Sequence, residues 1–391
     1  LEEKLGLVSL AMTMAYRGGV NYSDTMGVTR IWDTIIYRKL MEQNIVVPPA
    51  KPKHKSEYVG GYVKEVQPGL YDWVCSFDLN SLYPSIIVQW NMSPETLDVE
   101  KAQSGLDQDV CLDHSVPTVE GHSLAANGAT FTNEYQGIVP QIIAEYYAER
   151  KEIKKKMLDK KRELQKVDKN DKEKIKQLEI EITRLANNEQ SIKILLNSQY
   201  GAMSNAYFRY FSMPIAEGIT MTGQLAIRWA ERSVNQFMNK ILGTKDKDYV
   251  LAMDTDSLYV NMGDLVNKFQ PKNPVDFLDS VCKDKMEGVL SDAYQGLYDK
   301  MNCFTPRMEM SREVIADRGI WTAKKRYILN VHDNEGVRYS EPSLKIMGIE
   351  AIKSSTPASV RAALKDLFVT IINGTENDTQ KAIQRFREYF H

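Results

Sequence analysis

The chain has 391 residues, enough for more than one domain with a sizeable apolar core. Its 50 Lys and Arg residues nearly balance 52 Asp and Glu residues, so any nucleic-acid binding must depend on local basic clusters rather than on net charge. The four scattered cysteines contain no C-x-x-C pair, which argues against a zinc site or a disulfide framework and fits a reducing compartment. No apolar run is long enough to cross a bilayer, and there is no signal peptide. The first residue, Leu1, lies in a helical pattern, so we expect a fragment or a processed product.

The predicted elements mix helices and strands, which indicates an α/β (α+β) fold. A Pro/Lys-rich linker is expected at residues 47–55, and residues 98–137 are best read as loops and small strands. Helical patterns cover Ile31–Gln43, Pro140–Lys166, Lys172–Tyr200, Ala216–Ile241 and Pro274–Asn302, with a helical tail from Pro357, and strand patterns cover Tyr71–Asp78, Tyr249–Val260, Arg307–Val314 and Lys325–Val331.

The helices Pro140–Lys166 and Lys172–Tyr200 are separated by the short polar turn Val167–Asp171 (VDKND). Two long helices joined in this way form an antiparallel helical hairpin. The distal half of the hairpin is dense in Lys and Glu, which favours a projection into solvent, with a purely structural coiled coil as the alternative.

Two carboxylates, Asp254 and Asp256, lie at the tip of a predicted β-hairpin in Tyr249–Val260 (YVLAMDTDSLYV). Placing two carboxylates beside an apolar core is unfavourable unless a cation offsets their charge, and a divalent metal is the obvious candidate. Turns also carry Asp simply to bond their own backbone, and that is the alternative for the D-T-D motif alone.

A third carboxylate, Asp78, stands at the end of a predicted strand in Ser76–Ser85 (SFDLNSLYPS). One carboxylate at a strand end plus a pair on a hairpin is what a two-metal phosphoryl-transfer site requires, with two Mg²⁺ ions about 3.5–4 Å apart. The alternative is three unrelated surface aspartates.

Taken in order, these two motifs resemble motifs A and C of the family B (alpha-like) DNA polymerases. Between them, Lys193–Gly201 (KILLNSQYG) is similar to motif B of that family. The following Asn205–Tyr210 (NAYFRY) is most similar to the replicative polymerases of large tailed bacteriophages. The resemblance covers essentially the whole chain.

Within motif B, Lys193, Asn197 and Tyr200 follow an i, i+4, i+7 spacing and share one helix face. On the opposing helix, Arg150 and Lys154 at i, i+4 resemble the two other triphosphate contacts of the family. Arg offers a bidentate fork and Lys a point charge, and both suit phosphate oxygens. A solvated basic face is the alternative, weakened at these positions by the motif register.

In motif A, Ser81 and Leu82 would offer backbone amides to the triphosphate, and Leu79 would offer its carbonyl to a metal. By resemblance, Tyr83 is the steric gate, a ring beneath the incoming sugar that collides with a ribose 2′-hydroxyl. A core tyrosine at a strand-to-helix bend is the alternative.

Two shorter motifs are less specific. Tyr58–Gly61 (YVGG) resembles the Y-x-G-G loop near the template strand, although a plain turn is nearly as good an explanation. Lys324–Tyr327 (KKRY) resembles the K-K-x-Y strand that holds the primer backbone. Glu309 and Glu313 bracket Ser311, and no metal role is assigned there. From the Tyr58–Gly61 and Lys324–Tyr327 motifs, the expected DNA contacts are Tyr58, Gly60, Gly61, Lys324, Lys325 and Tyr327.

The resemblance implies a template-directed DNA polymerase core that adds deoxynucleotides to a primer 3′-hydroxyl. It implies two Mg²⁺ ions, with Mn²⁺ as a substitute, held mainly by Asp78 and Asp256 with the Leu79 carbonyl, while Asp254 assists. Primer-template DNA and deoxynucleoside triphosphates are the implied partners. A sliding clamp and a separate exonuclease or thumb polypeptide are further candidates, and a bacterial host cytoplasm is the implied location.

The expected domains are an N-terminal segment, a palm in two parts, helical-hairpin fingers and only the start of a thumb, with no room for a proofreading exonuclease. Two rival functions stay open: a catalytically weak or inactive nucleic-acid-binding fragment, and a metal-dependent nuclease, which has no use for Tyr83 or a triphosphate-binding helix. The domain boundaries are 1–77 for the N-terminal segment, 78–139 and 206–345 for the palm, 140–205 for the fingers and 346–391 for the thumb.

Overall fold

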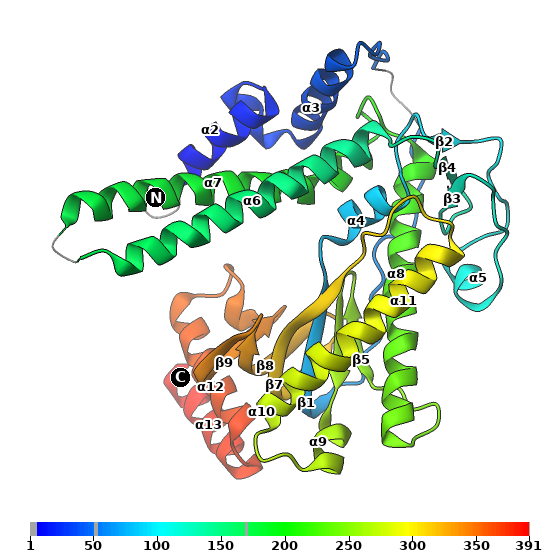
Figure 1. Ribbon diagram of the computed structural model, residues 1–391. Coiled ribbons are helices and arrows are strands. Elements are labelled where there is room, and N and C mark those ends of the chain that lie inside the picture. Colours follow the sequence, from blue (N-terminus) through cyan, green and yellow to red (C-terminus); the bar gives the residue numbers. More distant parts are fainter. Residues whose placement is uncertain (1–5, 51–53, 169–170, 391) are drawn as a thin grey trace. The chain divides into compact units, whose positions relative to one another are not determined.

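The computed structural model describes residues 6–50, 54–168 and 171–390. The chain folds into two units, each assembled from segments far apart in the sequence (Figure 1). The first unit comprises Leu1–Gly60, Ser81–Leu225 and Tyr298–Arg307, and the second comprises Gly61–Asn80, Ala226–Leu297 and Met308–His391. Within the described ranges, no helix combines the length and the apolar composition that a membrane crossing requires.

The second unit is built on a six-stranded sheet in which every neighbouring pair is antiparallel. Together with the helical hairpin of the first unit, this sheet confirms the predicted α/β fold class. The strand order is β5 (Val250–Asp254), β6 (Ser257–Asn261), β1 (Gly69–Leu79), β7 (Met310–Ala323), β8 (Arg326–Asn334) and β9 (Val337–Met347).

Apolar side chains cover both faces of this sheet because successive residues of a strand point to opposite sides. On β8, Tyr327 and Leu329 join the cluster that contains Val314 and Trp321, whereas Ile328 faces the other way and packs with Ile372. The sheet therefore has an apolar core on each face, and packing against these two cores holds the strands in fixed register.

Helices flank the sheet of the second unit. The indole of Trp229 on α8 (Met213–Leu242) donates to the carbonyl of Ala293 on α11 (Glu287–Lys300), which ties these two helices together. The remaining helices of this unit are α9 (Gly263–Phe269), α10 (Pro274–Val281), the π-helical turn Cys282–Met286, the 3-10 turn Glu350–Ile352, α12 (Ala358–Asn373) and α13 (Glu376–Phe390).

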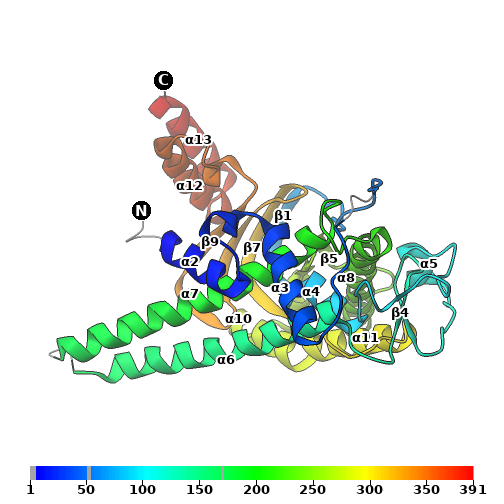
Figure 2. The ribbon, with the colours of Figure 1, turned by 90° about the horizontal axis from the view of Figure 1, so that it is seen from above.

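The first unit is dominated by the predicted helical hairpin, formed by α6 (Ile138–Lys166) and α7 (Lys172–Met203). Two N-terminal helices, α2 (Leu7–Gly18) and α3 (Val28–Glu42), lie along it (Figure 2). The buried indole of Trp32 on α3 donates to the carbonyl of Leu195 on α7 at 3.2 Å. These contacts anchor the proximal half of the hairpin.

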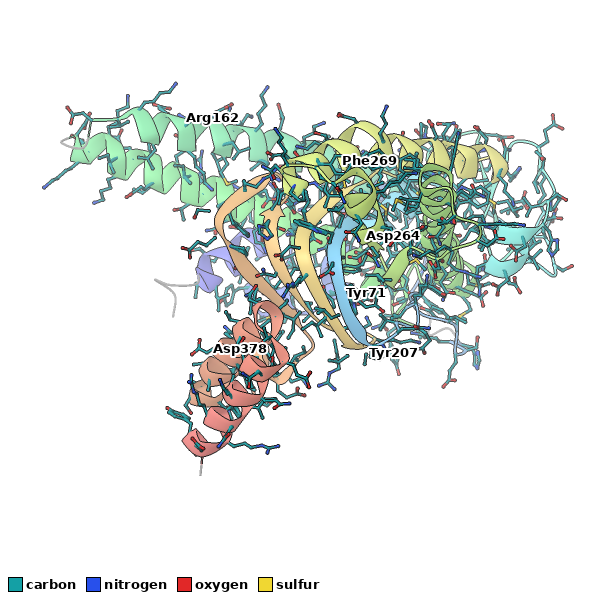
Figure 3. The ribbon with its side chains drawn as sticks, turned by 90° about the horizontal axis from the view of Figure 1, so that it is seen from below. Tyr71, Arg162, Tyr207, Asp264, Phe269 and Asp378 are labelled. Carbon is teal, nitrogen blue, oxygen red and sulfur yellow. The ribbon has the colours of Figure 1, made fainter. Side chains whose placement is uncertain are left out.

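The distal half of the hairpin carries exposed charges, as its composition predicts. Arg162 extends from α6 and is 72% exposed (Figure 3). Lys160 pairs with Glu163 on its own helix and with Glu181 on α7, so ion pairs link the two helices across this solvated half.

The rest of the first unit consists of short helices and a small sheet. Residues 51–53 of the expected linker and 169–170 of the expected hairpin turn lie outside the described residues. The elements are a 3-10 turn at Tyr22–Met26, α4 (Leu82–Gln89), α5 (Gln108–Asp113) and a three-stranded sheet of β2 (Leu97–Asp98), β4 (Thr130–Thr132) and β3 (His122–Leu124).

Candidate functional site

Strand β1 places Asp78 at its carboxyl end, in the second unit, between two neighbouring strands. Asp78 lies opposite Ser257 of β6 on one side and Ser311 of β7 on the other. The hydroxyl of Ser257 donates to Oδ1 of Asp78 at 2.9 Å. The serine that completes the D-T-D-S motif therefore orients the carboxylate of the other acidic motif.

The β5–β6 hairpin brings Asp256 to the same end of the sheet. Thr255 at its tip has φ of 60°, a left-handed conformation that lets the chain reverse tightly. The backbone amide of Leu79 donates to the carbonyl of Asp256 at 3.0 Å, which ties the hairpin tip to the end of β1. Leu79 itself is fully buried, so its backbone position is well fixed.

The carboxyl groups of Asp78 and Asp256 are electrostatically coupled. Burial raises the pKa of Asp256 to about 6, with further contributions from the charges of Asp78, Asp254 and Glu313. Burial also raises the pKa of Asp78, opposed by the hydrogen bond from Ser257. Two half-buried carboxyl groups whose ionised forms are disfavoured by burial and by nearby acidic side chains are well suited to bind a cation.

Asp254, in contrast, already has a counter-ion. Nζ of Lys325 lies 2.7 Å from Oδ1 of Asp254. Among the described residues, no group of three or more His, Cys, Asp or Glu side chains is arranged to hold a metal ion. The three predicted carboxylates share one end of the sheet, but Lys325 neutralises Asp254 and leaves Asp78 and Asp256 as the coupled pair.

Glu313 on β7 is a charged neighbour to which the sequence assigned no role. Its Oε2 accepts a hydrogen bond from Ser76 at 3.1 Å, and its Oε1 lies 2.7 Å from Nζ of Lys345 on β9. The charge of Glu313 raises the pKa of Asp78, whereas Lys345 lowers it. Because Ser311 and Glu313 are two residues apart on one strand, the sequence could have predicted that they share a face. The sequence could not predict the position of Lys345, because its strand was not predicted.

The other two K-K-x-Y residues make local contacts in the second unit. Lys324 forms an exposed ion pair with Glu65 at 2.6 Å. Tyr327 is buried, and its hydroxyl lies 2.7 Å from that of Tyr259, with its pKa raised to about 12 mainly by burial. Tyr327 thus supports the core of the sheet, and its expected contact with DNA rests on the motif alone.

In the first unit, the expected triphosphate contacts lie on α6 and α7. Lys154, Lys193 and Asn197 are exposed. Arg150 is half-buried, and its Nε donates to Oε1 of Glu189 at 2.7 Å. Three of the expected triphosphate contacts on the hairpin are therefore cationic, and of these Arg150 is held by a carboxylate.

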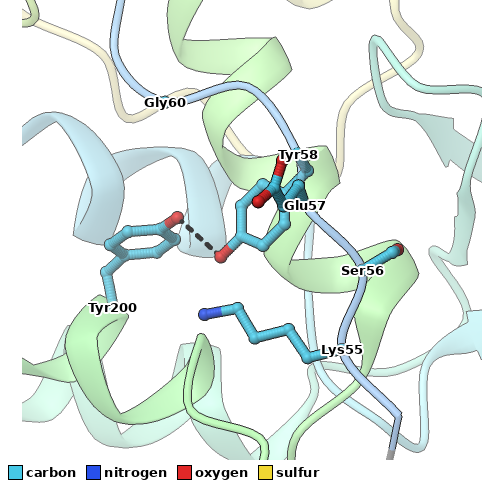
Figure 4. A pocket seen from close by; sticks show the side chains of 6 residues that line it. All are labelled: Lys55, Ser56, Glu57, Tyr58, Gly60 and Tyr200. Carbon is cyan, nitrogen blue, oxygen red and sulfur yellow. Dashed lines mark hydrogen bonds between the residues drawn. The ribbon is translucent and has the colours of Figure 1, made fainter.

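Three tyrosines of the first unit form a cluster. The hydroxyls of Tyr58 and Tyr200 lie 3.1 Å apart (Figure 4), and the rings of Tyr83 and Tyr200 have centroids 4.5 Å apart. Burial raises the pKa of Tyr200 far above its usual range, so its hydroxyl stays protonated. Tyr83 lies at the start of α4 beside Gly223, where an added Cβ would come within 3.2 Å of its ring.

An open pocket of about 590 Å³ adjoins this cluster (Figure 4). Lys55 lies 5.5 Å above the ring of Tyr58 and donates to the carbonyl of Ser204 at 2.7 Å. The carbonyl of Gly60 accepts a hydrogen bond from Gln224 on α8. The pocket combines a cation, aromatic faces and phenolic hydroxyls, and it is lined by Lys55, Ser56, Glu57, Tyr58, Gly60 and Tyr200.

Ser81 begins the helix α4 with a left-handed backbone, φ 51°. In the part of the chain that the structure describes, the side chain of Ser81 makes no capping hydrogen bond to this helix. A helix start of this kind favours anions. The expected contact of the Ser81 and Leu82 amides with phosphate stays a prediction.

The predicted site residues divide between the two units. Those of the first unit are Tyr58, Gly60, Ser81, Leu82, Tyr83, Arg150, Lys154, Lys193, Asn197 and Tyr200, and those of the second are Gly61, Asp78, Leu79, Asp254, Asp256, Lys324, Lys325 and Tyr327.

Comparison with known proteins gives consistent results. The sequence model of DNA polymerase family B matches residues 27–270. The chain is 36% identical to the DNA-directed DNA polymerase of Escherichia phage RB69, over 94% of this chain and 46% of that protein. It is 34% identical to the DNA-directed DNA polymerase of Enterobacteria phage T4, over 98% of this chain and 48% of that protein. A DNA polymerase of Pyrococcus glycovorans is 29% identical, over 77% of this chain and 32% of that protein.

The chain thus spans about half the length of the phage relatives that it matches. These matches confirm the resemblance that the three sequence motifs indicated. The family model covers more than half of the chain and includes all three motifs. The chain belongs to DNA polymerase family B.

Proposed function

We propose that this chain is the catalytic core of a template-directed DNA polymerase. The single observation that carries the proposal is the coupled pair Asp78 and Asp256 at the joined ends of β1 and the β5–β6 hairpin. Family membership supports the reaction: a primer 3′-hydroxyl attacks the α-phosphorus of a deoxynucleoside triphosphate, and pyrophosphate leaves.

The residues of this pair fit two divalent cations. Hard carboxylate and carbonyl oxygens are the ligands that Mg²⁺ and Mn²⁺ prefer, and because burial and nearby carboxylates raise the pKa of Asp256, a cation beside it would favour its ionised form. We assign Asp78, Asp256 and the carbonyl of Leu79 as ligands. We assign Asp254 a lesser, assisting role in metal binding, because Lys325 already offsets its charge. When bound, Mg²⁺ supplies a Lewis acid that stabilises the charge developing on the reacting oxygens.

The chain's own residues orient the ligands. Ser257 holds one oxygen of Asp78 in place through its hydroxyl. The Glu313–Lys345 pair keeps the charge beside Asp78 nearly balanced. The hydrogen bond from Ser257 orients the carboxylate without occupying all of its oxygen lone pairs.

The first unit is proposed to bind the triphosphate. Arg150, Lys154 and Lys193 contribute positive charge from the hairpin, which corresponds to the fingers, and the amides of Ser81 and Leu82 bind phosphate oxygens. Tyr83 acts as the steric gate against ribonucleotides, and its ring is supported by Tyr200. This use of the hairpin and of Tyr83 favours a polymerase over a metal-dependent nuclease.

DNA contacts complete the assignment. Asn197 and Tyr200 face the base pair, and Tyr58, Gly60 and Gly61 lie near the template. Lys324 and Lys325 bind the primer backbone without reading sequence, on the strand that Tyr327 supports. The strands of the second unit form the palm, with the helices after residue 346 as the start of the thumb. A sliding clamp or a separate exonuclease polypeptide are further proposed partners.

Primer extension with Mg²⁺ and all four deoxynucleotides tests the proposal. We expect extension by the native chain, and we expect Asp256→Ala to abolish it while leaving primer-template affinity nearly unchanged. Tyr83→Ala should raise ribonucleotide incorporation selectively. No extension at any enzyme concentration, with DNA binding intact, would instead identify a nucleic-acid-binding fragment that needs a separate polypeptide.

A further inference from the structure

One proposed triphosphate contact is held in place by a neighbouring carboxylate. Nε of Arg150 on α6 donates to Oε1 of Glu189 on α7 at 2.7 Å, and the two side chains are only 20% and 14% exposed. The ion pair thus spans the two helices of the hairpin in a partly desolvated place. There an arginine–carboxylate hydrogen bond is stronger than at an open surface.

We propose that Glu189 is a positioning residue that orients Arg150 for the triphosphate. This inference rests on the proposed function. In the described part of the chain, only Nε of Arg150 is engaged, by Glu189. The two terminal amino groups of the guanidinium remain available as a fork, and such a fork binds two oxygens of a phosphate side by side.

The opposite role, in which Glu189 blocks Arg150 until a substrate displaces it, is less consistent with the bond. A carboxylate that competes for the place of a phosphate would occupy the terminal fork with both oxygens. Glu189 instead uses one oxygen on Nε. Its bond therefore fixes the plane of the guanidinium rather than covering the edge that faces a ligand.

The residue next to Arg150 makes a similar ion pair that serves as an internal control. Glu149 accepts two hydrogen bonds from Arg17 on α2, at 2.8 and 2.9 Å, and Arg17 also reaches Asn188 at 3.4 Å. This pair ties α2 to the hairpin one residue away from the Arg150–Glu189 pair on each helix. Loss of either pair should loosen helix packing, but only loss of Glu189 should free Arg150.

The test compares Glu189→Ala, Glu189→Gln and the control Glu149→Ala in the full chain. Each variant is bound to a primer-template whose primer ends in a dideoxynucleotide, and the Kd for the next complementary deoxynucleoside triphosphate is measured by stabilisation of the ternary complex. No chemistry takes place, so the readout is binding alone. Urea denaturation of each variant records the change in stability.

We expect Glu189→Ala to weaken triphosphate binding roughly three- to tenfold, because binding must then order one long, rotamer-rich side chain. Glu189→Gln should stay within about twofold of the native chain, since its amide oxygen can still accept from Nε. Glu149→Ala should likewise leave the Kd nearly unchanged, even if it lowers stability. KM for the triphosphate in primer extension should follow the same order, with kcat little affected.

The outcomes separate the inference from the function on which it rests. Native-like binding by Glu189→Ala, or equal weakening by Glu149→Ala, would overturn the positioning role. Tighter binding by both Glu189 variants would overturn it in favour of a blocking role. A native chain that binds primer-template but no triphosphate would overturn the proposed polymerase function as well.

Discussion

Substitution of Gly61 by alanine should displace the acidic hairpin of the second unit. The segment after Gly61 runs beside the hairpin: the carbonyl of Tyr62 accepts from the amide of Thr255 at 2.9 Å, and the amide of Lys64 donates to the carbonyl of Met253 at 3.1 Å. A Cβ at Gly61 would stand 2.7 Å from Oγ1 and 3.0 Å from Cγ2 of Thr255. The residue between the two carboxylates thus packs directly on Gly61.

The size of the effect follows from this distance. An ordinary contact begins at 3.4 Å, so Oγ1 of Thr255 must retreat by about 0.7 Å (3.4 minus 2.7). Thr255 is β-branched, and rotation about χ1 only exchanges one heavy atom for another near Gly61. Overpacking of this kind costs about 1–3 kcal/mol of stability. Because a displacement near 1 Å in a catalytic site lowers rates by about 100-fold, we expect kcat to fall roughly 10- to 100-fold.

The adjacent glycine supplies a matched control. A Cβ at Gly60 has no atom within 4 Å, so Gly60→Ala should change stability by less than about 0.5 kcal/mol. Thr255→Gly removes the clashing side chain and also suits the left-handed backbone at the hairpin tip. In the double variant Gly61→Ala/Thr255→Gly, the destabilisation caused by alanine should therefore largely disappear, which a double-mutant cycle measures.

Two assays are needed. Urea denaturation gives the stability cycle and requires no activity, and single-nucleotide incorporation gives kcat beside the Kd for primer-template. If Gly60→Ala and Gly61→Ala weaken DNA binding equally and leave kcat alone, both glycines act through close approach to DNA and the hairpin argument is wrong. Failure of Thr255→Gly to relieve Gly61→Ala would refute it independently.

Three further predictions concern charges of the second unit. Folding raises the pKa of Asp256 to about 6, so the folded state holds this proton more tightly and the metal-free protein should lose stability as pH rises from about 4 to about 6. Asp256→Asn should lack this loss and be more stable at pH 7.5 by up to the order of 3 kcal/mol, as measured by urea denaturation in EDTA. Asp333→Ala should lower the free energy of unfolding by about 3 kcal/mol, because it removes the carboxylate that lies 2.5 Å from the buried guanidinium of Arg312. Equal stability of the variant and the native chain by the same method would contradict this. Lys325→Ala should cost less than about 1 kcal/mol, since its pair with Asp254 is half-exposed, yet Mn²⁺ titration should show tighter binding once the competing cation is gone.

Much of the fold was predictable because its elements have strong local periodicity. The helices expected at Pro140–Lys166 and Lys172–Tyr200 are confirmed as α6 and α7, within three residues at each end. The strand at Tyr71–Asp78 is confirmed within β1. In each case apolar spacing and a clear polar turn or proline mark the boundary.

Strand β9 (Val337–Met347) was missed, and β7 is longer than the expected Arg307–Val314. The first seven residues of β9 are exposed, so its sequence, VRYSEPS, shows no apolar alternation and contains Pro342. Such an edge strand is held by pairing with β8, and pairing partners distant in sequence leave no local signal. Because β9 was not predicted, the position of Lys345 and its ion pair with Glu313 were not predicted either.

The acidic residues show a similar limit. Motif spacing predicts that Asp78, Asp254 and Asp256 belong together, but it carries no information on their counter-ions. Lys325 lies in the turn between β7 and β8, and it reaches Asp254 at the end of β5 although β6, β1 and β7 lie between β5 and β8 in the sheet. Which carboxylate is neutralised and which stays exposed to its neighbours' charge is a property of the folded sheet.

The distribution of charge in this cluster predicts where a divalent cation contributes most. Lys325 offsets Asp254, and Ser257 stabilises the ionised form of Asp78. The pKa of Asp256 is raised by burial, and the charges of Asp78, Asp254 and Glu313 raise it further. A bound cation relieves all of these repulsions at once, so its affinity should depend more on Asp256 than on Asp254. Mn²⁺ affinity should accordingly fall further in Asp256→Asn than in Asp254→Asn, and the reverse order would show that the ion pair with Lys325 opens when metal binds.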